Sequence, residues 1–515
     1  MKSTPLSLIA GTVALAAVTG FAAFVAPGDE APKETKPAAA RLPVERSSLL
    51  CPAPGNSDLT ETTYTSFTPS GENSAEAGTG ELKPAAALLT DEDEEAAAKK
   101  KSKKEQEAEV KKKAAAEKPV VAVKEPGKPA TADTSASDAP ALVGTATGRL
   151  APGWAAQQTT TTLGGGSRGL LGVSCTAPDT DFWLPGASSA ESRQDYIHLT
   201  NPDDTAAVAD IELYGPEGAL KSDVGEGITV PARSSVPMLI STLITEAVDD
   251  LTVHVTTRTG RVGAVVRSAD DESGSDWLAP SADPAGTLVL PGIPADATSV
   301  HLVAFAPGED DADIKLRLLG KSAAFAPAGH ETLHIKSQMT ASVDLKDVTR
   351  GEPGSLELTP VKSDRAAPIV AALRVVRGTG DKKEVAYIPA TGPVSARASV
   401  TDNRAKGSVL SLTAPGASAE VKVTASAGSG GGEQAVKTYS VKGGTTLAVT
   451  PPVPAGLKGS YALTVETKSG GPVHAARTLV LPEDGIQMFT VQTLPDDGGT
   501  VVVPAAEQDL SVLED

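Results

Sequence analysis

The chain has 515 residues, a length that allows about three to four domains. Its formal net charge is −19 at pH 7, and this acidic balance argues against nucleic-acid binding, which needs a basic surface to neutralise phosphates. Aromatic residues make up only 3% of the chain, so its cores must be built mainly from Val, Leu, Ile and Ala. The 49 glycines and 39 prolines indicate many turns and some unstructured length.

An uncharged apolar segment lies close to the N-terminus, at residues 6–26. It is long enough to cross the roughly 30 Å hydrocarbon core of a bilayer. Lys2 precedes it and Asp29 follows it, so the preference for positive charge inside predicts residues 1–5 in the cytoplasm and nearly everything else outside. We therefore expect a single-pass protein of the cell membrane, with residues 6–26 as a transmembrane signal-anchor helix. The alternative is a cleaved signal segment and a secreted protein.

The next part of the chain alternates between flexible and strand-forming sequence. Residues 27–45 are typical of a linker, and residues 46–69 contain short stretches that we interpret as strands. Residues 70–140 are predicted to form a disordered, charged, partly helical insertion, because residues 91–118 consist almost wholly of Ala, Glu, Asp and Lys without an apolar stripe. We interpret the lysine clusters as a solvated spacer; contact with anionic lipid or polymer is the alternative. Residues 141–185 are expected to be strands that complete an N-terminal module.

Cys51 and Cys175 are the two cysteines of the chain. In an oxidising compartment such a pair is a candidate disulfide. The bond would join the two halves of the N-terminal module across the insertion, and the loop that it closes is worth about 4–5 kcal/mol in the chain-entropy treatment. The alternative is a pair of buried free thiols.

Sequence landmarks recur with a period of roughly 105 residues in the last two-thirds of the chain. The clearest are Leu184-Pro185-Gly186 with Leu290-Pro291-Gly292, Ala209–Leu213 with Ala312–Leu316 and Ala419–Val423, and Arg267 with Arg374 and Arg477. Such units of short alternating strands fit one antiparallel sandwich each, and they are too long for propeller blades or helical repeats. We therefore predict an all-β fold with three tandem immunoglobulin-like β-sandwich repeats, at residues 186–290, 291–392 and 393–515. The N-terminal strands either pair into one of these repeats or form a partial fourth.

Four stretches of sequence carry a family resemblance: LLCPAP (49–54), DFWLPG (181–186), LTNPDDTAAVADIELYGPEG (199–218) and ITVPARSSV (228–236). In these stretches the chain resembles an actinobacterial family of membrane-anchored or secreted proteins of unknown function. The resemblance covers most of the chain outside residues 70–140. It implies an envelope location and brings no catalytic residues with it.

The polar residues most suited to bind metals do not form a convincing site. His198 and His301 fall in equivalent early strands, which favours a shared packing position over a ligand pair. His330 and His334 are close in sequence, but they lie where a loop is expected to enter a strand, and not on a helix that would place both side chains on one face. The acidic run 309–313 lacks the spacing of a calcium loop, so a solvated turn is favoured.

Two tryptophans are candidates for a sugar-binding platform. Trp183 and Trp277 each precede a repeat boundary in similar sequence surroundings. This equivalent placement favours a structural plug in the fold over an exposed platform.

The sequence therefore assigns no catalytic, cofactor-binding or metal-binding residue, and it predicts no cofactor. We expect a non-enzymatic, membrane-anchored extracytoplasmic scaffold or accessory protein of the cell envelope. Its expected partners are other envelope proteins or wall polymer, and not nucleic acid. The alternative is a cell-wall glycan-binding protein, and a third hypothesis is an unrecognised hydrolase with a deep polar cleft. The oligomeric state is left open.

Overall fold

The computed structural model describes residues 40–55, 59–71, 77–85, 118–164, 167–483 and 485–504. Within them the predicted all-β class is confirmed: the elements are strands β1 to β38 and four short 3-10 helices, η1 (Gly148–Leu150), η2 (Ile240–Thr242), η3 (Ser363–Arg365) and η4 (Gly380–Lys382). The expected transmembrane helix at residues 6–26 lies outside the described residues. Among the residues that are described, no helix has the length and apolar character needed to cross a membrane.

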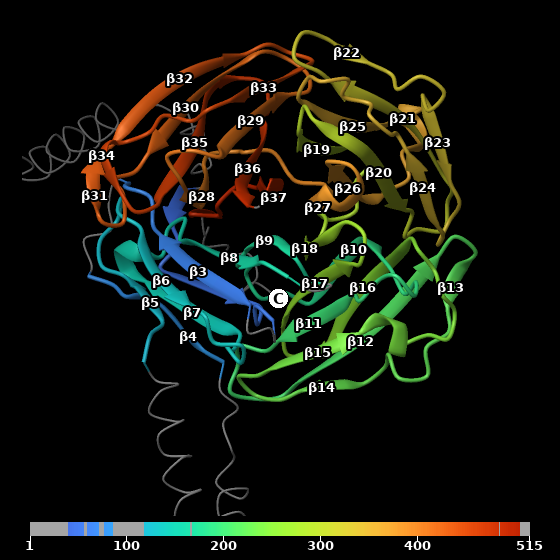
Figure 1. The fold of residues 1–515 in the computed structure, drawn as a ribbon, viewed down its shortest axis with the longest axis horizontal. Coiled ribbons are helices and arrows are strands. Elements are labelled where there is room, and N and C mark those ends of the chain that lie inside the picture. Colours follow the sequence, from blue (N-terminus) through green and yellow to red (C-terminus); the bar gives the residue numbers. More distant parts are fainter. Residues whose placement is uncertain are drawn as a thin grey trace, which may run out of the picture. The chain divides into compact units, whose positions relative to one another are not determined.

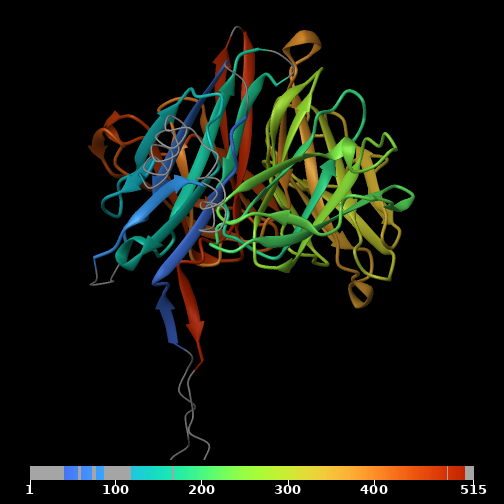
Figure 2. The ribbon, with the colours of Figure 1, turned by 90° about the horizontal axis from the view of Figure 1, so that it is seen from below.

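The chain divides into two compact units. The first comprises residues 1–42 and 501–515, and its described part is centred on a two-stranded sheet of β1 (Ala40–Pro43) and β38 (Thr500–Val503). Figure 2 shows these strands, blue and red, side by side, so the beginning and the end of the described chain meet. The second unit comprises residues 43–500 and holds the remaining strands.

The second unit contains four modules, each built on two sheets of four or five strands, and the third module has an additional two-stranded sheet. The N-terminal module is formed by β2 (Arg46–Cys51), β3 (Thr60–Phe67), β4 (Gly80–Pro84), β5 (Val121–Val123), β6 (Ala130–Thr134), β7 (Leu142–Thr147), β8 (Ala155–Thr162) and β9 (Gly169–Ser174). The first module is formed by β10 (Asp181–Ala187), β11 (Tyr196–Thr200), β12 (Ala207–Gly215), β13 (Gly218–Leu220), β14 (Ile228–Val230), β15 (Ser235–Leu239), β16 (Leu251–Thr259), β17 (Gly263–Asp270) and β18 (Gly274–Leu278).

The other two modules follow along the chain. The second module is formed by β19 (Leu288–Ile293), β20 (Ala297–Phe305), β21 (Ala312–Leu319), β22 (Ala324–Phe325), β23 (Thr332–Ile335), β24 (Thr340–Asp344), β25 (Gly354–Pro360), β26 (Val370–Arg377) and β27 (Glu384–Pro389). The third module is formed by β28 (Ala398–Asn403), β29 (Ser408–Ala414), β30 (Ala419–Ala425), β31 (Gly431–Glu433), β32 (Ala435–Val441), β33 (Thr445–Val449), β34 (Ala455–Lys458), β35 (Tyr461–Gly470), β36 (His474–Glu483) and β37 (Ile486–Leu494).

One strand order recurs in all four modules. The sheets run β2-β7-β4-β5 and β6-β3-β8-β9 in the N-terminal module, β10-β16-β12-β13 and β15-β11-β17-β18 in the first, β19-β25-β21-β22 and β24-β20-β26-β27 in the second, and β28-β35-β30-β32 and β33-β29-β36-β37 in the third. The first and second modules each have one more short strand: β14 pairs with β12, and β23 pairs with β21. Every ladder pairs neighbouring strands antiparallel. The N-terminal strands therefore form a complete pair of sheets of their own, and neither pair into one of the repeats nor form only a partial fourth.

Three predictions about the limits of the modules need correction. Strands β4, β5 and β6 lie within residues 70–140, which were predicted to be a disordered insertion. These strands are short, and only a few apolar side chains such as Leu82 and Val121 are buried, so charged sequence on both sides obscured them. The boundary placed between residues 185 and 186 falls inside β10, which already belongs to the first module, and the boundary placed between residues 290 and 291 falls inside β19, which belongs to the second.

The recurring Leu-Pro-Gly landmark is a β-bulge near the end of a strand. The register of β10 against β16 shifts at Gly186, and that of β19 against β25 shifts at Gly292. Both glycines have positive φ, 106° and 92°, a conformation that favours glycine. In β28 of the third module the register shifts in the same way between Val400 and Asn403, where Asp402 has a φ of 51°. The landmark is thus a bend within a module and does not mark a linker.

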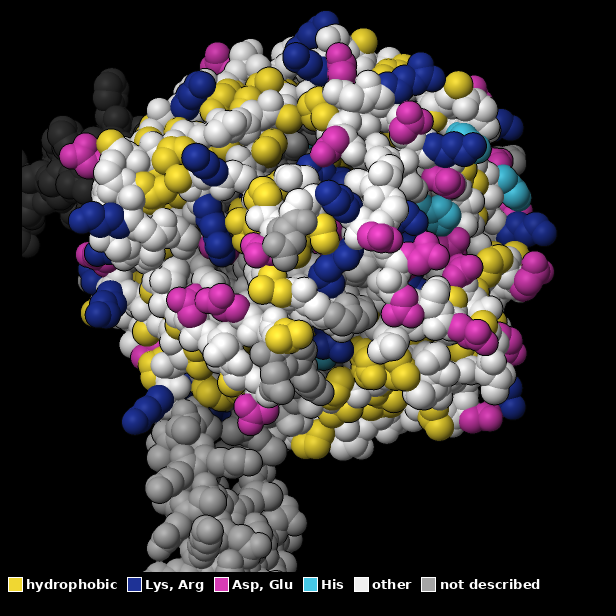
Figure 3. Space-filling view, viewed as in Figure 1, with side chains coloured by type: hydrophobic (Ala, Val, Ile, Leu, Met, Phe, Trp, Pro, Cys, Tyr) yellow, Lys and Arg dark blue, Asp and Glu magenta, His cyan; other side chains and the backbone are white. Residues whose placement is uncertain are grey.

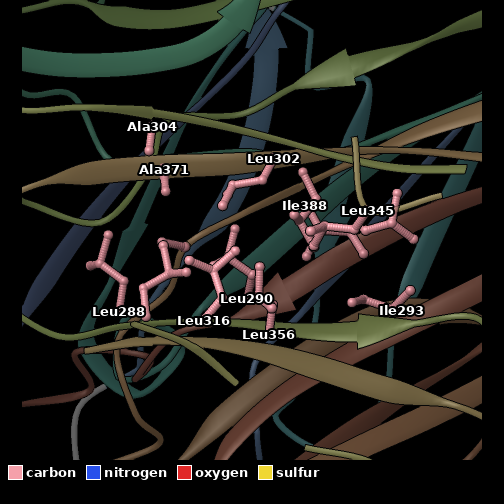
Figure 4. Packing of buried hydrophobic residues seen from close by; sticks show 14 of the residues in the cluster. Leu288, Leu290, Ile293, Leu302, Ala304, Leu316, Leu345, Leu356, Ala371 and Ile388 are labelled. Atoms are coloured by element: carbon pink, nitrogen blue, oxygen red, sulfur yellow. The ribbon is translucent and has the colours of Figure 1, made fainter. Parts of the chain in front are cut away.

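The core of each module lies between its two sheets. In the second module, Leu290 and Leu356 of one sheet face Leu302 and Ile388 of the other, and all four are fully buried (Figure 4). A fully buried Leu or Ile contributes roughly 1.5–3 kcal/mol relative to an exposed one. Alternation along β21, with Ile314, Leu316 and Leu318 inside, places this apolar set on one face, as the sequence pattern predicted.

The last strands of the modules close the second unit into a ring. Each of β9, β18, β27 and β37 is an edge strand of its sheet. β9 contacts β18, β18 contacts β27, β27 contacts β37, and β37 contacts β9 again. Figure 1 shows these four strands together in the middle of the second unit, and in Figure 2 the N-terminal module (blue to teal) lies beside the third module (orange to red). The last strand of every module therefore lines the centre of this ring.

Candidate functional site

The centre of the ring holds a buried carboxyl group, that of Asp276 in β18. Its Oδ1 accepts a hydrogen bond from the backbone N–H of Gly172 in β9, at 2.9 Å. The hydroxyl of Thr490 in β37 lies 3.1 and 3.0 Å from the two carboxyl oxygens. Asp276 therefore binds groups of the N-terminal and third modules, and its own strand β18 contacts β27 of the second module.

The environment of Asp276 favours its protonated form. Burial raises the pKa of the carboxyl well above its ordinary value, although the hydrogen bonds that it accepts act in the opposite direction. An edge strand has backbone N–H groups that no neighbouring strand pairs, and such groups need an acceptor once they are buried. Asp276 supplies that acceptor, so we assign it a structural role.

A second buried network joins the first and second modules. The guanidinium of Arg193 donates to both carboxyl oxygens of Asp195, at 3.1 and 2.7 Å, and to the hydroxyls of Ser268 and Tyr387, both at 2.8 Å. Ser268 and Tyr387 also share a hydrogen bond of 2.8 Å. The first three residues belong to the first module and Tyr387 to the second, so the network stabilises the contact between the two modules.

Beside this network, a cleft of about 680 Å³ opens between the first and second modules. Arg193 lines it from within, and charged groups from both modules surround it; these are Asp249, Asp250, Asp270, Glu272, His301, Arg374 and Lys383. Figure 3 shows Asp and Glu side chains gathered on the right of the view, over these two modules. The size of the cleft is within the range of small-molecule sites, so it is the candidate functional site.

Ion pairs across the module boundary hold the charged groups of the cleft. Arg374 donates to Asp270 at 2.7 Å, and Nε2 of His301 lies 3.0 Å from both carboxyl oxygens of Asp250. Burial alone would raise the pKa of both carboxyls, but Arg374 lowers the pKa of Asp270, and the hydrogen bond with His301 lowers that of Asp250. Lys383 pairs with Glu272 at 3.2 Å. The arrangement suits the binding of a polar ligand and the joining of two modules.

The predicted disulfide is confirmed. Cys51 and Cys175 are bonded, with their Cα atoms 4.5 Å apart. The bond connects the end of β2 with the residue that follows β9, so it ties the first strand of the N-terminal module to the last. Both residues are buried in the core of that module.

His198 and His301 are in the corresponding strands β11 and β20, but the shared packing position expected from the sequence is wrong. His301 lies opposite Arg374, as Tyr196 lies opposite the corresponding Arg267, so His301 corresponds to Tyr196 and not to His198. His198 is buried against the edge of Trp277, and burial, together with the nearby Arg267, lowers its pKa to about 3. His334 lies in β23, at the end of the expected loop, and contacts Asp313 at 2.8 Å. Among the described residues, no group of three or more His, Cys, Asp or Glu side chains is arranged to hold a metal ion.

The tryptophans are not equivalent, contrary to the sequence interpretation. Trp183 lies in β10, the first strand of the first module, and Trp277 lies in β18, the last strand of the same module. Trp277 is 2% exposed, so it fills the fold and cannot serve as an exposed sugar platform. Trp183 is half-buried and stacks on His254, with ring centroids 3.6 Å apart.

Sequence reasoning missed the two networks that hold the ring together. Arg193 stands in a polar, turn-like stretch, and Asp276 follows Ser273-Gly274-Ser275. Nothing in the neighbouring sequence points to their partners in other strands, which are at least 75 residues away. The recurring arginines gave a partial signal. Arg267, Arg374 and Arg477 lie in β17, β26 and β36. Each is paired with a residue of the adjacent strand that lines the centre of the ring, β18, β27 or β37.

Comparison with known proteins gives a family and no activity. A search of curated proteins found no match. A protein-family model described as a family of unknown function, DUF5719, matches residues 130–452. The matched region is more than half of the chain and runs from β6 into the third module. The chain therefore belongs to the DUF5719 family, whose function is unknown.

Proposed function

We propose that this protein is a non-enzymatic, membrane-anchored scaffold or accessory protein of the cell envelope, with its modules outside the cytoplasm. The observation that carries the proposal is the ring of four modules, closed by contacts among β9, β18, β27 and β37 and by the carboxyl of Asp276. Such a unit offers a broad, fixed surface to several partners at once. Three ion pairs between the first and second modules engage charged groups of the cleft there, which suits assembly and binding better than proton transfer.

We also propose that the four modules are tandem immunoglobulin-like repeats. The common strand order, the antiparallel ladders and the bulge in the first strand of three modules support this assignment. Immunoglobulin-like sandwiches host many unrelated functions, so the fold itself does not specify an activity.

Two features of the chain support a location outside the cytoplasm. Residues 6–26 are uncharged and long enough to cross a bilayer. The bond between Cys51 and Cys175 suits an oxidising compartment, because cytosolic thiols are kept reduced. The proposed partners are other envelope proteins or wall polymer.

The location is tested in intact cells of the source organism. We expect the full chain to sediment with membranes, to be digested by protease added outside the cells, and to carry both cysteines in oxidised form under non-reducing alkylation. A double variant, Cys51→Ser with Cys175→Ser, provides the control for the alkylation assay. Recovery of the full-length chain in the cytosol with both thiols free would refute the proposal.

Crosslinking in intact cells tests the scaffold role separately. We expect the purified crosslinked complexes to contain the same few envelope proteins or wall fragments in repeated experiments. Turnover of a simple ester, peptide or glycoside by the purified chain, lost on substitution in the cleft between the first and second modules, would instead favour a hydrolase.

A further inference from the structure

A second cleft, of about 660 Å³, lies between the third module and the N-terminal module. We propose that it binds an acidic carbohydrate, a sugar chain that bears carboxylate or phosphate groups. The inference extends the proposed envelope role. Only the source of the ligand in the cell rests on that role; the binding itself does not. It rests on how this cleft differs from the corresponding contact between the first and second modules.

At the contact between the first and second modules, aromatic side chains fill the space. Trp183 in β10 is paired with His254 in β16, and the two rings stack at 3.6 Å and 7°. Phe305, at the end of β20 in the second module, lies 5.4 Å from the ring of Trp183 and 4.6 Å from that of Tyr214. No room remains there for a ligand between these rings.

The third module has small hydroxyl side chains at the corresponding positions. Counted back from the bulge, Ser399 in β28 corresponds to Trp183, and its partner Thr464 in β35 corresponds to His254. Phe67 and Phe305 correspond to each other, because each is the last residue of the second strand of its module. Phe305 faces the first module, and Phe67 lines the cleft beside the third module. The replacement of two stacked rings by Ser399 and Thr464 leaves the space open.

The walls of the open cleft carry groups that bind sugar hydroxyls. Thr424 and Ser426 of β30 and Thr464 of the adjacent β35 line it, with Ser70 and Gln434 at its sides. The hydroxyl oxygen of Thr424 is buried and finds no hydrogen-bond partner among the described residues. A buried hydroxyl without a partner is unfavourable unless a ligand or water satisfies it, so this wall is suited to a polar ligand.

The charge of the cleft favours an anion. Lys422, Lys468 and Arg397 line it, and Glu466 is the acidic side chain that faces them. Glu466 binds both lysines, at 2.9 and 3.0 Å, and positions their ammonium groups side by side. Arg397 is itself paired with Asp497, so the three cations and the two carboxylates that bind them leave one net positive charge, in a chain whose net charge is −19. A carboxylate or phosphate on the sugar would be attracted to this part of the surface.

The proposal is tested by isothermal titration calorimetry on the purified full chain in detergent, with three probes. These are a short oligogalacturonate, a maltose oligomer of equal length as the neutral probe, and inorganic phosphate. We expect the oligogalacturonate to bind at least about tenfold more tightly than either of the others, because only it presents both hydroxyls and regularly spaced anions. Phosphate binding as tightly as the oligogalacturonate would overturn the carbohydrate part of the proposal.

A pair of lysine variants locates the site. Lys468→Glu reverses a half-exposed charge in the cleft and should weaken oligogalacturonate binding by roughly tenfold or more. Lys458→Glu makes the same change at an exposed position of the third module outside the cleft, and it should leave binding unchanged. Equal weakening in both variants, or no binding of the oligogalacturonate to the unaltered chain, would overturn the proposal. The result does not depend on the location of the protein in cells.

Discussion

Removal of the Asp276 carboxyl should destabilise the whole ring. In Asp276→Ala, the N–H of Gly172 and the hydroxyl of Thr490 lose an acceptor at about 3 Å and remain buried. A buried donor without a partner costs roughly 1–3 kcal/mol, so the variant should lose about 2–6 kcal/mol of its free energy of unfolding.

Asp276→Asn tests whether the neutral form of this side chain is sufficient for stability. Because burial raises the pKa of Asp276 and so favours the neutral acid, a neutral amide of the same shape should cost only about 1 kcal/mol or less. The free energy of unfolding is measured by urea denaturation, followed by circular dichroism, at pH 7. Asp283→Asn, at an exposed position close by, serves as the control and should change it by less than about 0.5 kcal/mol. An alanine variant as stable as the unaltered chain, or an asparagine variant as damaged as alanine, would refute this account of the ring centre.

Three further perturbations have defined expectations. Reduction of the bond between Cys51 and Cys175, whose sequence separation is 124, should lower the free energy of unfolding by about 5 kcal/mol in the chain-entropy treatment, measured by urea unfolding with and without reductant; an unchanged midpoint would contradict it. Gly172→Ala places a Cβ within 2.4–2.7 Å of side chains of β37 and should cost roughly 1–3 kcal/mol in the same assay, whereas a neutral result would show that the ring centre is loosely packed. Burial raises the pKa of Glu384 to about 7 from 4.5, against the opposing effect of Arg168, so its contribution to stability is full below pH 4.5 and is lost as the pH rises to 7. Glu384→Gln should remove this decrease from the pH profile of the free energy of unfolding, and an identical profile in the variant would contradict the prediction.

Patterns that are local in the chain could be predicted well from the sequence. Strands such as β12 and β21 alternate apolar and polar residues because one face is buried, and the landmarks of the repeats reflect this alternation. The pairing of Cys51 with Cys175 followed from the presence of two cysteines in similar surroundings. The position of His334 at a loop end followed from the turn residues before it.

Features that depend on distant contacts could not be predicted. The Leu-Pro-Gly landmark was interpreted as a boundary, but Gly186 bends a strand, and its sequence gives no sign of the partner strand. Trp183 and Trp277 have similar neighbours in the sequence, yet they lie in the first and the last strand of one module. Asp276 is an ordinary strand residue by composition, and its role arises only where four edge strands meet.

The claim on which the rest depends is that the four modules form one unit closed around β9, β18, β27 and β37. Differential scanning calorimetry of the purified chain tests it most directly. A single transition whose calorimetric and van't Hoff enthalpies agree is the predicted result, because modules that share one buried centre should unfold together. Several separate transitions, unaffected by Asp276→Ala, would show instead that the modules are independent.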